Sequence, residues 1–251
     1  DLKVTVLERR HVVGGAAVTE EFHPGFRNSV ASYTVSLLHP KIIRDLRLHE
    51  YGLRIVEREI ANFLPTEDGR YLAVGGGRTH EEVAKFSQRD AERIDAYAQH
   101  LEVIADLLRE IVLETPPNIV EGGFRTVLPE WLSAVKLGKR FKRLDMKMRR
   151  ELLSLFVGSA GDFLDGWFES DPIKAVYGFD SVVGNYASPY SPGSAYVLLH
   201  HVFGEVNGKK GTWGHAIGGM GAITQAMAKA AASRGADIRV NAGVREILIE
   251  N

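Results

Sequence analysis

The feature that most constrains the fold is a short apolar run near the start of the sequence. Residues 2–7 read LKVTVL, which is rich in β-branched side chains and nearly continuous in apolar character. Such a run is typical of a buried strand in a parallel sheet, because a surface strand alternates apolar and polar residues. Glu8 follows directly, and Gly14 and Gly15 come soon after it. The pattern predicts a parallel strand that carries an acid at its carboxyl end.

This acid has two interpretations. At the carboxyl edge of a parallel sheet, a carboxylate can accept hydrogen bonds from the ribose hydroxyls of a dinucleotide. An ordinary strand-end acid followed by a turn has the same pattern. The neighbouring residues favour the dinucleotide site, because paired glycines allow a ligand close to the backbone, and Arg9 or Arg10 can face a phosphate or cover an adenine. The sequence contains no G-x-G-x-x-G, so it predicts no phosphate-binding first turn.

The middle of the sequence is predicted to be helical. From Thr79 to about Leu155, helix-forming residues and 3.6-residue periodicity dominate. Thr79 and Ser87 are each followed three residues later by an acid, so both are expected to cap helices. We expect helices over residues 88–114, 128–137, 145–157 and 193–204.

Strands and helices are expected together at the two ends of the chain. The predicted helices cover residues 37–53 and 218–235, and the predicted strands cover residues 54–59, 61–66, 70–74, 236–240 and 244–250. A hairpin turn is expected at Glu67-Asp68-Gly69, because Asp-Gly readily supplies a positive φ. The order of sheet, helical insert, helix and sheet predicts an α/β (α+β) protein.

Charge and cysteine content exclude several classes of function. The formal net charge is −1 and the isoelectric point about 6.8, so the whole chain offers no electrostatic case for nucleic acid or an anionic membrane surface, although a local patch stays open. The absence of cysteine excludes a disulfide framework, a thiolate nucleophile and a dithiol redox pair within this chain. The nine histidines have no H-x-x-x-H or H-E-x-x-H spacing, so no metal site is predicted.

The apolar runs are short. None approaches the roughly 18 residues that span a bilayer, and no secretory signal pattern is visible at the start. The chain as given is therefore expected to have no transmembrane segment and to be cytoplasmic. Its oligomeric state is not predicted.

Two ordered segments carry a family resemblance. Residues 4–33, VTVLERRHVVGGAAVTEEFHPGFRNSVASY, resemble the segment just after the dinucleotide fingerprint in the flavin-dependent phytoene desaturase and amine oxidase superfamily. Residues 218–247, GGMGAITQAMAKAAASRGADIRVNAGVREI, are similar to the second FAD-domain segment of that group. Two matches in this order, separated by a helical insert, are more specific than either alone. The likeness is strongest to the phytoene dehydrogenase-related oxidoreductases of uncertain substrate.

The resemblance implies an FAD/NAD(P)-binding Rossmann-like domain with a largely helical substrate-domain insert. Residues 1–78 would hold part of the FAD-binding domain and the start of the substrate-domain sheet, residues 79–212 the helical substrate or cap region, and residues 213–251 the return to the FAD-binding domain. The family's first strand and glycine loop would precede Asp1, and its last FAD segment would follow Asn251. The domain is therefore expected to be incomplete, and the sequence an internal fragment that alone binds FAD poorly or not at all.

The same resemblance implies the cofactor-binding residues. Glu8 would bind the ribose of FAD, Arg9 and Arg10 would lie along the adenosine, Gly14, Gly15 and Ala16 would pass near the pyrophosphate or flavin, and Val244 would touch the adenine.

Catalytic residues are not identified by the sequence, because in such enzymes the flavin carries the hydride chemistry. His200, His201, Trp213 and His215 could face a substrate, although packing roles are the simpler interpretation. Asp162 and Asp165 could share a helix face for acid–base chemistry or cation binding, but a solvated helix end is the preferred interpretation.

The leading hypothesis is part of an FAD-dependent oxidoreductase that moves hydride from a C–C or C–N bond of an apolar or amphipathic small molecule to flavin. One alternative is a non-catalytic, degenerate flavoprotein fold kept for protein interaction. Another is an NAD(P)-dependent dehydrogenase.

Overall fold

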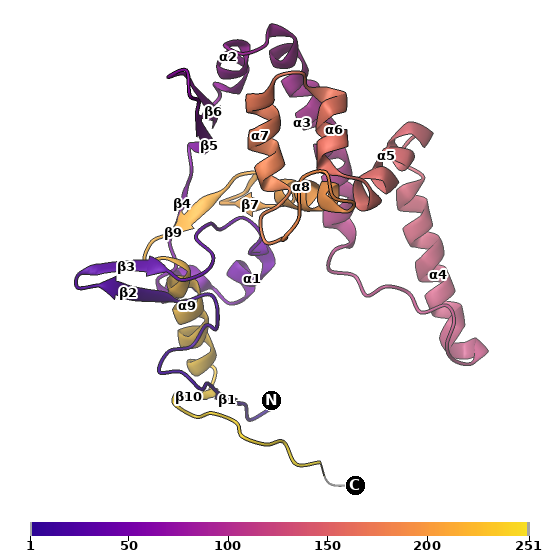
Figure 1. The fold of residues 1–251 in the computed structure, drawn as a ribbon. Helices are drawn as coiled ribbons and strands as arrows, with labels where there is room; N and C mark the ends of the chain where they lie inside the picture. The colour runs from indigo at the N-terminus through magenta and orange to yellow at the C-terminus, as the bar shows by residue number, and fades with distance from the viewer. Residues whose placement is uncertain (1, 250–251) are drawn as a thin grey trace. The chain divides into compact units, whose positions relative to one another are not determined.

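The computed structural model describes residues 2–249, apart from the side chain of Thr126. The chain divides into two compact units, each described here by itself (Figure 1). Unit 1 comprises residues 1–58 and 204–251, and unit 2 comprises residues 59–203. The mixed helix and strand class is confirmed. The three-part division drawn from the sequence, with boundaries after residues 78 and 212, stays a prediction.

Unit 1 is built from short strands and three helical segments. Its strands are β1 (Thr5–Leu7), β2 (Thr19–His23), β3 (Phe26–Ser29), β4 (Ile55–Glu57), β7 (Glu205–Val206), β8 (Lys209–Lys210), β9 (Gly214–Ala216) and β10 (Asp237–Arg239). Its helices are α1 (Pro40–Asp45), the 3-10 helix η1 (Leu48–Tyr51) and α9 (Met220–Ala232). The core is small and apolar, and its buried members are Val35, Leu48, Leu53, Ala216, Ile223, Ala226 and Ala230.

The predicted parallel strand is present as β1. It pairs in parallel with β10, with Val6 opposite Ile238, and α9 leads directly into β10 (Figure 1). The expectation that β1 is buried is wrong for the chain as described. Val6 and Leu7 are 41% and 50% exposed, because β10 is the single strand that pairs with β1 among residues 2–249.

The other strand pairs of unit 1 are antiparallel. β2 and β3 form a hairpin, β4 pairs with β9, and β7 pairs with β8. The pairing of β4 with β9 joins residues some 160 positions apart in the sequence, with Val56 opposite His215.

Unit 2 is a β-hairpin followed by helices. The hairpin consists of β5 (Ile60–Pro65) and β6 (Tyr71–Gly75). The helices are α2 (Thr79–Ala84), α3 (Gln88–Ile111), α4 (Phe124–Phe141), α5 (Met146–Val157), α6 (Ala160–Trp167), α7 (Asp171–Asp180) and α8 (Ser194–Val202).

Helix α3 organises the core of unit 2. Its buried positions Ile94, Tyr97, Leu101, Ile104 and Leu108 repeat every three or four residues, which places them on one face of the helix. The face packs with buried side chains of α5 to α8 in one cluster. Apolar periodicity is the direct cause of this packing, because only one face of the helix is withdrawn from water.

A buried carboxylate ties α3 to α7. Asp90 has 0% exposure and accepts hydrogen bonds from the backbone N–H of Glu169 at 2.9 Å and of Ser170 at 2.8 Å. The hydroxyl of Ser170 donates to the same carboxylate at 2.5 Å. Three donors satisfy a charge that would be costly to bury alone. Asp90 therefore fixes the segment that begins α7, where Ser170 is the N-cap.

An aromatic cluster fills the same core. The ring of Tyr97 lies 5.0 Å from Phe168, 5.0 Å from Tyr177 and 5.6 Å from Trp167. Burial raises the pKa of Tyr97 well above its usual value, because the phenolate form would lose its hydration.

Cap predictions were confirmed at one position and wrong at another. The hydroxyl of Ser87 accepts the backbone N–H of Asp90 at 3.1 Å, so Ser87 is the N-cap of α3. Thr79 is the first residue of α2 instead of its cap, and its hydroxyl accepts the N–H of Gly75 at 3.0 Å. The turn that ends β6 competes for the same hydroxyl, which explains the difference.

Two segments differ from their predicted form. The predicted helix over 37–53 is broken between α1 and η1, where Arg47 adopts a left-handed φ of 52°. The predicted strand over 244–250 is absent from residues 244–249, and Glu250 lies outside the described residues. Its apolar side chains face solvent, with Ile247 and Ile249 81% and 89% exposed, because no described strand offers them a pairing partner.

Within residues 2–249, no helix combines the length and apolar character that a bilayer crossing requires. The same residues contain no cluster of three or more histidine, aspartate or glutamate side chains that could hold a metal ion.

Candidate cofactor site

Glu8 follows the last residue of β1, at the carboxyl end of the parallel pair. One carboxylate oxygen, Oε1, accepts the backbone N–H of Arg10 at 2.8 Å. This bond turns the chain immediately after the strand and holds the side chain in place. Among the described residues no donor is bonded to the second carboxylate oxygen, so it is available to a ligand.

A strap after β10 runs beside Glu8. The backbone N–H of Glu8 donates to the carbonyl of Arg239 at 2.8 Å, and the N–H of Ala242 donates to the carbonyl of Glu8 at 2.8 Å. The N–H of Asn241 donates to the carbonyl of Arg10, also at 2.8 Å. Three backbone bonds therefore bring residues 8–10 and 239–242 together, although they are more than two hundred positions apart in the sequence.

Val244 lies just beyond this strap. It is 60% exposed and belongs to no helix or strand. The stem of Arg9 packs on the preceding residue, since a Cβ built on Gly243 would lie 3.4 Å from Arg9 Cγ. The structure therefore places Val244 one residue from a direct contact with Arg9, close to the predicted adenosine-binding residues.

The two arginines have different partners. Arg10 forms an ion pair with Glu20 of β2, so its charge is already neutralised. Arg9 is exposed and makes no ion pair with the residues that the structure describes. Arg9 is therefore the more suitable of the two to meet a phosphate or an adenine ring.

The paired glycines also differ from each other. Gly14 has a φ of 129°, and a Cβ there would lie 2.7 Å from both the carbonyl oxygen of Ala17 and the hydroxyl of Thr224. Gly14 is therefore required for packing against α9. Gly15 has a φ of 58° and faces open space, and Ala16 after it is exposed. A ligand can approach the backbone at Gly15 and Ala16, whereas Gly14 is occupied by the protein itself.

The amino end of α9 is closed by the β2–β3 hairpin. The hydroxyl of Ser29 accepts the backbone N–H of Met220 at 3.0 Å, and the hydroxyl of Thr19 accepts that of Gly221 at 3.0 Å. The first amides of the helix are thus satisfied within the chain, so residues 218–221 are better interpreted as a tight loop than as an anion site. Thr19 and Ser29 were not identified as site residues, although Thr19 follows the glycine pair in the sequence pattern.

A shallow depression of about 310 Å³ lies along the same loop of unit 1. Its walls are residues 11–13, the face of α9 that carries Gln225 and Lys229, and the side chains of Ile238 and Val240. None of the seven predicted cofactor residues lines it. The depression is an apolar surface next to the candidate site and not the site itself.

The histidines and the tryptophan proposed from the sequence have structural contacts. Burial lowers the pKa of His200 and of His201, and Nδ1 of His201 lies 2.7 Å from the carbonyl of Val197, one turn earlier in α8. In unit 1, Nδ1 of His215 lies 2.8 Å from the carbonyl of Tyr33, and the guanidinium of Arg58 lies over the ring of Trp213.

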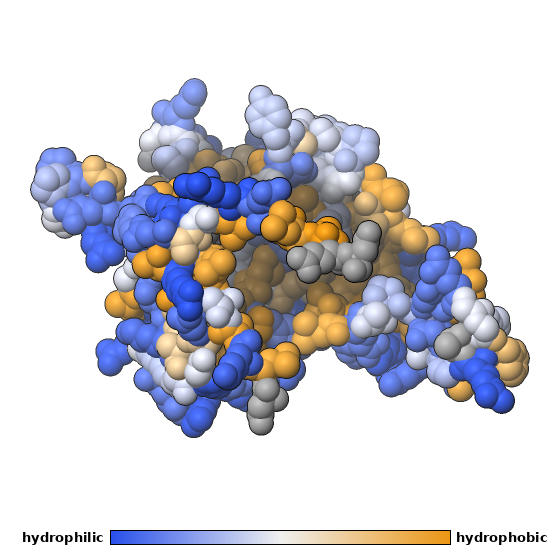
Figure 2. All heavy atoms as spheres, turned by 90° about the horizontal axis from the view of Figure 1, so that it is seen from below, coloured by the Kyte–Doolittle hydropathy of each residue, from blue (hydrophilic) through white to orange (hydrophobic). Residues whose placement is uncertain are grey.

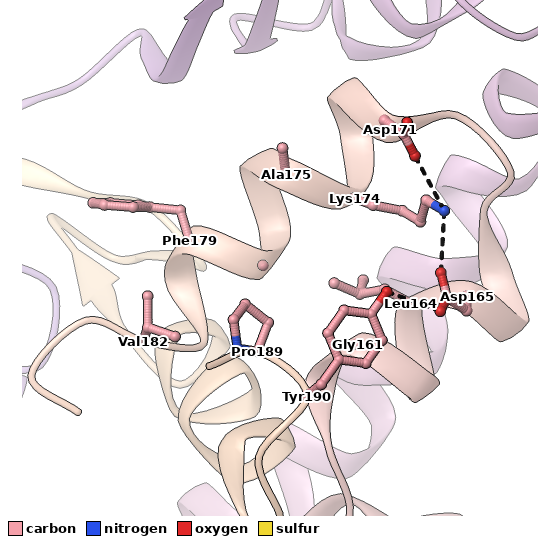
Figure 3. A pocket seen from close by; sticks show the side chains of 11 residues that line it. Gly161, Leu164, Asp165, Asp171, Lys174, Ala175, Phe179, Val182, Pro189 and Tyr190 are labelled. Atoms are coloured by element: carbon pink, nitrogen blue, oxygen red, sulfur yellow. Dashed lines mark hydrogen bonds and ion pairs between the residues drawn. The ribbon is translucent and has the colours of Figure 1, made fainter. Parts of the chain in front are cut away.

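Asp162 and Asp165 do not act as a pair. The carboxylate of Asp162 accepts the hydroxyl of Ser159, the N-cap of α6, at 2.5 Å. Asp165 instead meets Nζ of Lys174 at 3.1 Å and accepts the hydroxyl of Tyr190 at 3.0 Å, beside a pocket of about 320 Å³ (Figure 3). The hydrogen bond from Lys174 lowers the pKa of Asp165, so this carboxylate stays ionised at neutral pH and is a poor general acid.

The residues around Glu8 fit the adenosine half of a dinucleotide. Within residues 2–249, they supply a carboxylate with one oxygen free for ribose hydroxyls, a guanidinium without an ion pair, and an open stretch of backbone at Gly15. They do not supply a helix amino end for the pyrophosphate, since Ser29 and Thr19 close that of α9.

Comparisons with known proteins show what the chain as a whole is similar to. The family model for flavin containing amine oxidoreductase matches residues 2–251. The mouse protein named pyridine nucleotide-disulfide oxidoreductase domain-containing protein 2 is 36% identical over 262 aligned residues, which cover 100% of this chain and 45% of the mouse protein. One component of the limonene dehydrogenase of Castellaniella defragrans is 39% identical over 94 residues, covering 36% of this chain and 17% of that protein.

Solved structures show the same fold. A variant of putrescine oxidase has a TM-score of 0.51 at 18% identity and covers 97% of this chain and 46% of its own. An oxidoreductase from Methanosarcina mazei has a TM-score of 0.50 at 15% identity, over 99% of this chain and 48% of its own. The chain thus spans about half the length of the proteins that it matches throughout.

Proposed function

The chain belongs to the flavin-containing amine oxidoreductase family, and on that basis we propose that the protein is an FAD-dependent oxidoreductase in which this chain forms the adenosine end of the cofactor site. The observation that carries the proposal is the position of Glu8. It stands at the carboxyl end of a parallel strand, fixed by the strap of residues 239–242, with one carboxylate oxygen free.

Each predicted residue has a task that its geometry supports. The free oxygen of Glu8 accepts hydrogen bonds from the ribose hydroxyls, and the exposed guanidinium of Arg9 meets the adenine or a phosphate. The backbone at Gly15 and Ala16 passes beside the cofactor, and Val244 meets the adenine. Arg10 positions the loop through its ion pair with Glu20.

Bound FAD would supply the hydride acceptor. The protein would then have to hold the substrate against the flavin and exclude water, and no described residue is needed as a nucleophile. The name of the mouse relative contains the words disulfide oxidoreductase. This chain has no cysteine, so it contributes no redox-active dithiol to the reaction.

The substrate class is an apolar or amphipathic molecule that loses hydride from a C–C or C–N bond. The names of two similar proteins support the two bond types. A limonene dehydrogenase subunit supports the C–C bond, and a putrescine oxidase supports the C–N bond. Limonene is a hydrocarbon and putrescine an amine.

The test is flavin content. The protein is purified at its natural length, and its yellow absorbance and the bleaching of that absorbance by dithionite are recorded. A colourless protein that cannot be reconstituted with FAD contradicts the proposal and supports a non-catalytic module. If such a colourless protein reduces NAD(P)⁺ while it oxidises a substrate, it supports an NAD(P)-dependent dehydrogenase instead.

A matched pair of variants tests the role of Glu8. Glu8→Gln keeps the size of the side chain but removes its charge, so we expect about tenfold or greater loss of FAD affinity, the usual effect of weakening a hydrogen bond to a charged group. Glu67→Gln removes an exposed acid from the hairpin turn of unit 2 and should leave FAD affinity unchanged. Titration of the apoprotein with FAD measures both.

A further inference from the structure

Helix α4 exposes a stripe of large apolar side chains. Phe124, Trp131 and Leu132 are 80%, 58% and 65% exposed, and Leu128 and Val135 are 47% and 41% exposed. At 100° per residue these five positions fall within an arc of about 100°, the width of a normal apolar helix face. Such a face normally packs on a core, but here it is open to solvent in unit 2 as described. Hydrophobic residues share the surface with hydrophilic ones in Figure 2.

The sequence around this stripe is strongly basic. Residues 124–150 contain nine lysines and arginines and two acids, a net charge of +7 within a chain whose total is −1. Part of this charge is neutralised, because Arg140 and Arg143 form ion pairs with Glu110 and Glu114 at the end of α3. Arg125, Lys136 and Lys139 make no ion pair with the described residues.

These three basic residues border the apolar stripe. Counted around the helix, Arg125, Lys136 and Lys139 lie at or beside one edge of the apolar arc. Apolar side chains that include a tryptophan, with lysine and arginine along their edge, are the pattern of a helix that lies in a membrane interface. Long basic side chains can keep their charge at the headgroups while the stripe enters the acyl boundary.

We propose that α4 docks the protein on an anionic lipid bilayer. The stripe from Phe124 to Val135 enters the boundary between the headgroups and the acyl chains, and Arg125, Lys136 and Lys139 contact the anionic phosphates. Charge complementarity selects this occupant, because an acidic lipid surface matches the basic border and an acyl boundary matches the apolar stripe. A nucleic acid would match only the basic border, and no helix among the described residues is suited to cross the bilayer.

The experiment is co-sedimentation of the purified protein, at its natural length, with vesicles. Vesicles of phosphatidylcholine are compared with vesicles in which about a third of the lipid is phosphatidylglycerol. We expect binding to the anionic vesicles to be at least about tenfold tighter, and to weaken when the salt concentration is raised severalfold, because each basic residue near the surface contributes an attraction that salt screens.

Two double variants separate the apolar and basic contributions. Trp131→Ser with Leu132→Ser removes apolar area, and Lys136→Glu with Lys139→Glu reverses two charges. Each should weaken binding to anionic vesicles about tenfold or more. The matched controls, Phe22→Ser with Phe26→Ser and Lys3→Glu with Arg27→Glu, make the same changes at exposed positions of unit 1 and should bind within about twofold of the unaltered protein.

Three outcomes overturn the proposal. One is the absence of binding to anionic vesicles, which means that another part of the protein or a second copy covers the stripe. Another is equal loss in the α4 variants and the controls. The third is binding to duplex DNA with none to vesicles. Circular dichroism of every variant shows whether a loss of binding comes from unfolding, and flavin content is read separately, so failure here leaves the proposed function untouched.

Discussion

Two carboxylates, Glu8 in unit 1 and Asp90 in unit 2, each lie at one end of a secondary-structure element but meet opposite environments. Both accept backbone N–H groups. Asp90 is fully buried and receives three donors, so nothing is left for a ligand. Glu8 is partly exposed and receives one donor, which leaves an oxygen free. A fully satisfied carboxylate stabilises the fold, whereas a positioned but incompletely satisfied one is suited to binding.

The largest expected effect is on the free energy of unfolding, when Asp90 is replaced. Asp90→Ala removes the buried carboxylate that accepts two backbone N–H groups and a hydroxyl, so we expect the free energy of unfolding to fall by about 3 to 5 kcal/mol, the sum of three hydrogen bonds to a charged group. Glu92→Ala, at an exposed position two residues further along α3, should cost less than about 0.5 kcal/mol. Urea denaturation measures both. Equal effects of the two substitutions would show that the Asp90 bonds do not stabilise unit 2.

The paired glycines sharpen the same contrast within unit 1. Gly14→Ala forces a Cβ to within 2.7 Å of backbone and side-chain atoms at a positive φ, so we expect a loss of about 2 kcal/mol or more. Gly15→Ala meets no atom and should cost about 1 kcal/mol, the usual penalty for a left-handed residue. Thermal unfolding ranks the two. The prediction fails if Gly15→Ala is the more destabilising substitution.

Smaller effects are expected from pH. Burial lowers the pKa of His100. The carboxylate of Glu151, 3.2 Å away, raises this pKa but only in part, and Lys147, which lies in α5 with Glu151, lowers it further. The unfolded state therefore binds a proton more readily than the folded state, so stability is highest above the ordinary histidine pKa of about 6.5 and falls as pH drops from there towards the folded pKa.

Burial acts in the same direction on His200 and His201. His100→Gln should make the decline of stability between about pH 7 and pH 5 shallower, whereas His23→Gln, at an exposed position of β2, should leave the slope as it is. Unfolding free energies measured across this range decide between the two results. A steeper decline of stability in His100→Gln would contradict the prediction that folding lowers the pKa of His100.

Local signals in the sequence predicted much of this protein. Four features follow from short patterns and are present in the structure: the parallel strand that ends just before Glu8, the Ser87 cap, the start of α5 after Asp145 and the end of α9 before Gly235. Such features depend on neighbours within a few residues, so the sequence contains what determines them.

Local sequence patterns did not predict the features that depend on partners far away in the sequence. The bonds of Asp90 reach residues 169 and 170, Arg10 is paired with Glu20 whereas Arg9 has no ion pair with the described residues, and residues 244–249 lack the predicted strand. The cofactor roles of Glu8, Arg9, Gly15, Ala16 and Val244 stay predictions for the flavin experiments.

The sequence by itself determined which residue types stand at the carboxyl end of β1, and the approximate positions of the β5–β6 hairpin and of helices α3, α5, α8 and α9. Only the tertiary structure decided which groups already have a partner among the described residues. Asp90 and the amino end of α9 have hydrogen-bond partners, Arg10 has an ion pair, and Gly14 has close packing neighbours. One oxygen of Glu8, the guanidinium of Arg9, Gly15 and the apolar stripe of α4 are left open to a ligand or to solvent. The physical reason is that secondary structure arises from local periodicity and capping, whereas satisfaction depends on which donor, charge or surface folding brings alongside from elsewhere in the chain.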